Sequence, residues 1–267
     1  MGPSIEKCEE KDAEELLSFL KRELNYHTFI LADIYHYGFD KPYQQIYVER
    51  KAGEISAVFL RYFTNLILAG TPGEDACREI WGLHEKQVRT VMGKAELVEQ
   101  FTKWIGEISE KPVAKELYVL KNGEKLYSEG ECVCAAGEKE IDVVYGFLMT
   151  IPGFRELYGE KEMIRNRIRN KEGEHLYFST DKEIKAHANT AAATPWACMI
   201  GGVAVGPAYR HRGFGHRIVS AAARRALENG QRPIVFSEWP QEQNLFCDLG
   251  FQKIGNWGVL NLTEKIT

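Results

Sequence analysis

The stretch from Ile200 to Gly230 constrains the fold of this chain most strongly. An apolar run to Val205 is followed by a Gly-Pro turn, a loop with two glycines, and a segment whose apolar residues recur at helical spacing. This pattern predicts a buried strand, a turn, a glycine loop, and a helix that begins near Gly215 and stops at Gly230. The apolar face of that helix consists of Ile218, Val219, Ala222, Ala223, Ala226 and Leu227.

The glycine loop has the features of an anion-binding site. Backbone amides in such a loop and in the first helical turn can lack partners within the chain, and the helix dipole favours negative charge there. Glycine at 213 and 215 would let a phosphate approach these amides. Residues 207–232 contain six arginines and one acid, in a chain of net charge −4, which suits a ligand with several phosphates. The alternative is an ordinary strand-turn-helix junction with a solvated basic helix.

Two common nucleotide loops do not fit this sequence. No Lys-Ser or Lys-Thr follows the glycines, as a nucleoside-triphosphate loop requires. A dinucleotide loop would need the spacing G-x-G-x-x-G with an acid about 20 residues further on, whereas Glu228 lies within the predicted helix.

The loop resembles that of a known family. Arg210-His-Arg-Gly-Phe-Gly215 is similar to the R/Q-x-x-G-x-G/A loop of the GNAT acyl-CoA-dependent N-acyltransferases. Val203-Ala204-Val205 resembles that family's splayed strand, and Leu249-Gly-Phe251 its usual ending. The resemblance implies that the loop amides bind the pyrophosphate of coenzyme A and that the strand pairs with its pantetheine arm. The cofactor-binding residues it implies are Val203, Ala204, Val205, Arg210, His211, Arg212, Gly213, Phe214, Gly215 and His216.

Length and composition set further bounds. The 267 residues suggest one large domain or two of similar size, with a hydrophobic content of 44% that is enough for a proper core. Six scattered cysteines and no visible signal segment favour reduced thiols in a cytoplasmic protein. Residues 186–209 carry no charge, but their prolines and glycines argue against a membrane span. The overall acidity argues against nucleic acid.

The order of predicted elements repeats once along the chain. After residues 121–124, strands and helices follow in the same order as before, which predicts two domains, 1–126 and 127–267. The expected fold class is α+β, a three-layer α/β arrangement of two GNAT-like copies, each with a mixed, mostly antiparallel sheet flanked by helices. The first copy has only Ala69-Gly-Thr-Pro-Gly73 in place of the loop, and 17 basic against 21 acidic residues. It resembles the degenerate amino-terminal copy of tandem GNAT proteins, and we expect a scaffold there.

Acyl transfer from a thioester to an amine needs an unprotonated amine, so a base usually helps. The sequence offers Glu238, at a predicted strand end, and His187, on the strand beside the central one, each with a plain structural role as the alternative. The proton-donating tyrosine that GNAT enzymes often carry is Phe246 here, and a nearby asparagine is Trp239. Tyr209 and Cys247 are weaker candidate donors, and Trp196 and Trp239 are candidates to line an acceptor pocket.

The leading hypothesis is therefore a cytoplasmic N-acetyltransferase that moves an acetyl group from acetyl-CoA to a primary amine by direct attack, without a metal. Its partner would be a small-molecule or peptide amine. The rival hypothesis, which Phe246 and Trp239 motivate, is a non-catalytic acyl-CoA-binding sensor or interaction module. The acceptor and the oligomeric state are left open by the sequence.

Overall fold

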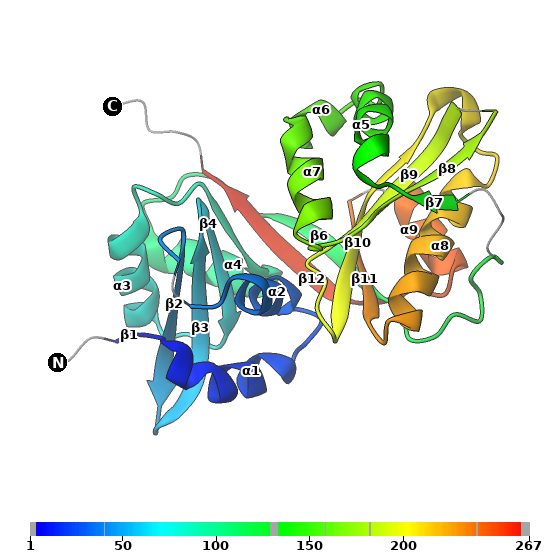
Figure 1. Ribbon diagram of the computed structural model, residues 1–267. Coiled ribbons are helices and arrows are strands. Elements are labelled where there is room, and N and C mark those ends of the chain that lie inside the picture. The colour runs from blue at the N-terminus through cyan, green and yellow to red at the C-terminus, as the bar shows by residue number, and fades with distance from the viewer. Residues whose placement is uncertain are drawn as a thin grey trace. The chain divides into compact units, whose positions relative to one another are not determined.

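The computed structural model describes residues 4–39, 41–128, 133–157, 159–181, 183–238 and 240–262 (Figure 1). The chain forms two compact units. Unit 1 consists of the residues up to Leu117 together with those from Gly255 onward, and unit 2 is Tyr118–Ile254. Within the described ranges, no helix is both long and apolar enough to cross a membrane.

Unit 1 is a mixed sheet with helices. Its strand order is β1-β2-β3-β4-β5-β12, in which only β4 and β5 run parallel. The elements are β1 (Glu6–Lys7), α1 (Ala13–Lys21), α2 (Thr28–Tyr37), β2 (Gln44–Lys51), β3 (Glu54–Tyr62), β4 (Asn65–Gly70), α3 (Glu74–His84), β5 (Thr90–Lys94), α4 (Ala95–Ile105), β6 (Val113–Val119) and, at the end of the chain, β12 (Gln252–Asn261). The last residues of β6 and the first of β12 belong to unit 2.

Unit 2 repeats this plan. Its strand order is β6-β11-β10-β9-β8-β7, with an antiparallel run from β7 to β10 and a parallel pair of β10 and β11. The elements are β7 (Val133–Ala135), α5 (Ile141–Met149), α6 (Phe154–Leu157), α7 (Lys161–Arg169), β8 (His175–Thr180), β9 (Glu183–Ala191), β10 (Ala197–Val205), α8 (Phe214–Glu228), β11 (Arg232–Ser237) and α9 (Pro240–Asp248).

The same physical constraint shapes both copies. Parallel neighbours need a crossover connection, and a helix supplies it each time: α3 joins β4 to β5, and α8 joins β10 to β11. The predicted fold class, two copies of a mixed and mostly antiparallel sheet flanked by helices, is confirmed.

The pairing of the final strand makes the two compact units differ from the two copies that the sequence repeat predicts. Although β12 follows α9, its residues Trp257 to Asn261 pair antiparallel with Lys94 to Thr90 of β5. Compactness therefore groups residues from Gly255 onward with the first half of the chain. The division into 1–126 and 127–267 refers to the two copies in sequence order, and it stays a prediction.

The sheet of unit 2 is covered on both faces, as Figure 1 shows. One core lies beneath α8 and α9 and includes Ile200, Val219 and Phe246. The other lies beneath α5 and α7 and includes Ile164, Ile184 and Ala204. The predicted apolar face of α8 is confirmed, since all of its members except Leu227 are buried and Leu227 is partly buried.

Unit 1 has a turn between β3 and β4. Phe63 adopts a left-handed φ of 47° there, and its amide donates to the Tyr43 carbonyl at 2.7 Å. Near the start of the chain, Glu6–Lys7 pairs with β2 as a strand, and the first α-helix begins at Ala13.

Candidate functional site

The central strand of unit 2 contains a bulge. The register between β9 and β10 shifts between Gly201 and Ala204, and Gly202 has a left-handed φ of 57°. One extra residue moves the following side chains to the opposite face of the sheet. Ile200 accordingly lies in the core beneath α8, whereas Ala204 lies in the core beneath α5 and α7. Val203 and Val205, which flank Ala204, pack partly against the α8 side.

Beyond the bulge, β10 and β11 diverge. Their parallel pairing covers only Ala197 to Met199, although β10 continues to Val205 and β11 to Ser237. Along the described part of both strands no further ladder pair joins them. A strand edge left without a partner can pair with an extended ligand. The end of β10 therefore offers backbone groups beside the loop that follows it.

The loop leaves a set of backbone amides unused. After a 3-10 turn at Pro207–Tyr209, the chain enters α8 with Gly213 as N-cap, and the first backbone bond of the helix joins the Arg217 amide to the Gly213 carbonyl at 3.1 Å. Within the described ranges, the amides of residues 211–216 donate to no protein oxygen with hydrogen-bonding geometry. Unpartnered amides at the N-terminus of a helix form a site for an anion.

The structure requires glycine at positions 213 and 215 for different reasons. Gly213 has a φ of 80°, and a Cβ added there would meet no atom within 4 Å. The space in front of the amides is therefore open, as a phosphate site requires. A Cβ at Gly215 would lie 2.8 Å from Cδ1 of Leu245 on α9. Gly215 thus allows α8 to pack against α9, and its role in the approach of a phosphate stays a prediction.

The side chains of the loop separate into exposed cations and anchored aromatics. Arg210, His211 and Arg212 are exposed, and the arginine side chains place positive charge next to the amides. Phe214 packs against Phe178 with ring centroids 5.1 Å apart. The Tyr209 hydroxyl donates to the Glu183 carboxylate at 2.5 Å, which raises the pKa of Tyr209 and engages its only proton.

His187, one of the two predicted bases, is buried at the bulge. Its Nδ1 lies 2.8 Å from the Gly202 carbonyl, and its Nε2 lies 3.0 Å from Nδ1 of His175. Since the carbonyl can only accept, Nδ1 carries the proton and Nε2 accepts from His175. Burial lowers the pKa of His187 to about 4. These contacts describe a residue that holds the bulge in place, and a role for His187 as base stays a prediction that this geometry does not support.

Glu238, the other predicted base, is exposed at the end of β11. Because β10 and β11 are parallel, their carboxyl ends lie at the same edge of the sheet, so Glu238 and the loop share that edge. The Glu242 carboxylate accepts from the Glu238 amide at 3.2 Å and from the Ser237 hydroxyl at 3.4 Å. This contact was missed, although Pro at the first position of α9 and Glu at the third are a recognisable helix start.

The remaining predicted groups are not all brought together. Phe246 is buried between Tyr118 and Phe251, with ring centroids 6.3 and 5.7 Å away. Cys247 is exposed on α9. Trp196 directly precedes β10 and therefore lies at the opposite end of that strand from the loop. Trp239 lies outside the described residues.

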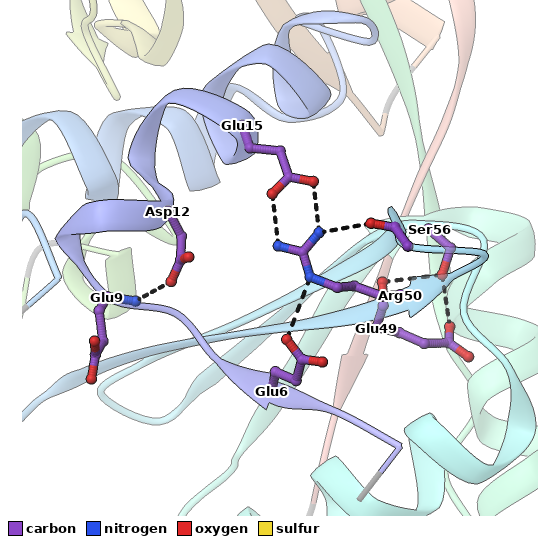
Figure 2. A network of polar contacts seen from close by, with 8 residues as sticks. Glu6, Glu9, Asp12, Glu15, Glu49, Arg50 and Ser56 are labelled. Carbon is purple, nitrogen blue, oxygen red and sulfur yellow. Dashed lines mark hydrogen bonds and ion pairs between the residues drawn. The ribbon is translucent and has the colours of Figure 1, made fainter.

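The corresponding place in unit 1 is filled from within the protein. The N-cap of α3 is Gly73, and its amide donates to Oε2 of Glu49 at 2.9 Å. The same carboxylate accepts from the Ser56 hydroxyl at 3.2 Å, and Lys51 lies 3.5 Å away. Figure 2 shows Glu49 with Ser56 beside the separate cluster in which Arg50 binds Glu15. A carboxylate thus occupies the position that an external anion would take in this copy.

No group of three or more potential metal ligands occurs among the described residues. A cavity of about 470 Å³ lies in unit 1 rather than beside the loop, and Trp81, Arg89 and Glu110 are among its lining residues. The loop amides, the open side of Gly213 and the end of β10 on the side that faces β11 thus form the candidate functional site of unit 2.

Residues 141–251 match the family model described as the acetyltransferase (GNAT) family. This match covers the bulged strand, the glycine loop and α8, so this part of the second copy is similar to the GNAT family. The first copy lies outside the match, as a degenerate copy would. No curated protein matches the chain.

Solved structures resemble nearly the whole chain. A Drosophila protein matches with 13% identity and a TM-score of 0.69 over 98% of this chain and 99% of its own. A tandem GNAT protein from the clavulanic acid biosynthesis pathway matches with 10% identity and a TM-score of 0.59 over 96% and 97%. A GNAT-family acetyltransferase from Colwellia psychrerythraea matches with 14% identity and a TM-score of 0.58 over 97% and 99%. At these identities the likeness shows the fold, which is the tandem GNAT arrangement.

Proposed function

We propose that this protein is an N-acetyltransferase that transfers an acetyl group from acetyl-CoA to a primary amine of a small molecule or peptide by direct attack. The observation that carries the proposal is the set of unused amides at residues 211–216, open to solvent at Gly213 and adjacent to the end of β10, which has no ladder pair with β11 beyond Met199. The family assignment supports acyl transfer in general, and the choice of acetyl group and amine is our proposal.

The residues of unit 2 fit coenzyme A in two respects. The amides of residues 211–216 would hold the diphosphate, and the exposed side chains of Arg210 and Arg212 add positive charge. The backbone of Val203 to Val205 would pair with the pantetheine arm as an added strand. Coenzyme A supplies an acyl group activated as a thioester.

Glu238 is the proposed base. It is exposed at the same edge of the sheet as the loop, where a carboxylate can accept a proton from an incoming ammonium group. Phe246 cannot protonate the departing thiolate. Because the pKa of a thiol is about 8.5, the thiolate leaves without a strong need for an acid. The proposed chemistry therefore requires a base more than it requires an acid.

The second candidate function is a non-catalytic acyl-CoA binder. Phe246 favours it, since its phenyl ring is buried in the core at the position where the family often carries a proton donor. Such a protein would bind acetyl-CoA through the same loop without releasing thiol.

The test uses the purified full chain, acetyl-CoA and a panel of amines, with free thiol as the readout and calorimetry for binding. Thiol release that depends on an amine, and that Glu238→Gln abolishes, supports the acetyltransferase. The matched control is Glu228→Gln, an exposed acid at the far end of α8, which should leave the rate unchanged. Binding without thiol release would select the second candidate, and absence of binding would overturn both.

A further inference from the structure

Tyr127 lies against the first turns of α8 although no motif marks it. Its amide donates to the Ser220 hydroxyl at 3.1 Å, and its carbonyl accepts from Nη2 of Arg224 at 2.9 Å. Its ring stacks on the ring of His216, with centroids 5.5 Å apart and planes 19° from parallel. Residues 216, 220 and 224 are spaced by four, so they lie on one face of the helix. The backbone of Tyr127 is therefore held in place independently of its ring.

The stack is located next to the phosphate site. His216 is the third residue of α8, and its own amide is one of the unused donors. Helical side chains lean toward the N-terminus of the helix, so this ring lies toward the end that carries the loop. Its Nε2 is 3.2 Å from a carboxylate oxygen of Asp248 on α9, which fixes the orientation of the imidazole.

The ring of Tyr127 is not used to fill a core. The residue is 47% exposed, and among the described residues its ring packs against the ring of His216 alone. An exposed aromatic ring that is backed by a second, fixed ring presents a flat apolar face to solvent. Nucleic-acid bases bind such faces by stacking, and because every base has such a face, no specific hydrogen bonds are needed.

We propose that the Tyr127–His216 stack is a platform for the adenine base of coenzyme A. This inference rests on the proposed function, because it places the base by its attachment to a diphosphate at the α8 loop. In coenzyme A a single ribose separates the base from the diphosphate, and in the protein a single helical turn separates the platform from the amides. Tyr127 thereby contributes to affinity for the nucleotide part of the cofactor and not to the acyl transfer.

The test compares coenzyme A with 4′-phosphopantetheine, which has the same arm but a single phosphate and no adenosine, by calorimetry on the full chain. Tyr127→Ala should weaken binding of coenzyme A about tenfold, a typical loss for one base–aromatic stack, and should leave binding of phosphopantetheine unchanged. Tyr127→Phe keeps the ring and should bind coenzyme A as the wild type does. Thermal unfolding checks that the variants remain folded.

The outcomes separate this inference from the proposed function. If the wild type binds coenzyme A and Tyr127→Ala weakens both ligands equally, or neither, the platform is refuted while the acyl-CoA site stands. The platform is also refuted if the wild type binds coenzyme A no more tightly than phosphopantetheine. If the wild type binds neither ligand, the proposed function fails and the platform fails with it.

Discussion

Replacing Gly213 with aspartate should weaken the binding of coenzyme A more than asparagine at the same position does. Gly213 has a φ of 80°, and aspartate and asparagine are the residues other than glycine that tolerate this region best. Both side chains have nearly the same size, and a Cβ at this position meets no atom within 4 Å. The pair therefore differs in charge and in the donor group of the asparagine amide, at the position where the diphosphate is proposed to bind.

The size of the effect follows from Coulomb's law. Two like charges about 4 Å apart repel by about 1 kcal/mol in bulk water and about 4 kcal/mol at an effective dielectric constant of 20. Because the loop is exposed, we expect the lower half of this range, so the aspartate variant should bind about 10- to 50-fold more weakly than the asparagine variant. Salt screens such interactions, so the difference should shrink as ionic strength rises.

Calorimetric titration with coenzyme A at low and high salt measures the difference. Thermal unfolding is the control, and both variants should unfold at similar temperatures because the added side chain points into open space. Equal affinity of the aspartate and asparagine variants for coenzyme A would refute the reasoning, since it would mean that the phosphates do not lie in front of these amides.

Further predictions concern Glu238, Phe246, Glu49 and His187. Glu238→Gln should lower kcat for an amine roughly 100-fold or more without changing the Kd for coenzyme A; an unchanged kcat would exclude Glu238 as the base. Phe246→Tyr should destabilise unit 2 by about 1–3 kcal/mol, because it buries a hydroxyl in an apolar core. It should not speed the release of thiol, and a faster release would show that the missing acid limits the rate. Glu49→Ala should destabilise unit 1 by about 1–3 kcal/mol, because it leaves the Gly73 amide unpaired, and calorimetry should still find one coenzyme A per chain. An unchanged unfolding midpoint would contradict the role of Glu49 in capping α3. Burial lowers the pKa of His187 to about 4. Its contribution to stability is therefore complete above its unfolded pKa of about 6.5, and it is lost as the pH falls from there towards 4. A thermal midpoint that stays constant between pH 6.5 and 4.5 would contradict this prediction.

The strand, loop and helix of the candidate site could be predicted because their signals are local. The apolar face of α8 follows from helical periodicity, which a short stretch of sequence contains in full. The unused amides are a property of any helix N-terminus, and Gly213 marks the left-handed residue that begins this one. The repeat of element order likewise predicted two copies of one fold, because each copy carries its own alternation of strands and helices.

The remaining features depend on residues that are distant in sequence. Glycine is needed at position 215 because Leu245 of another helix lies against it. Glu49 accepts a hydrogen bond from the amide of Gly73 at the start of α3, 24 residues further along the chain. The contact of His187 with Gly202 exists only because a bulge turns that carbonyl towards β9. No local pattern encodes these partners.

By itself, the sequence determined that the chain holds two copies of one fold, which face of α8 is apolar, and where the loop with its unused amides lies. Only the tertiary structure decided that β12 pairs with β5, that His187 is buried at the bulge, and that Tyr127 stacks on His216. The physical reason is that periodicity and capping act within a few residues, whereas strand pairing, burial and ring stacking depend on which distant segments the folded chain brings together.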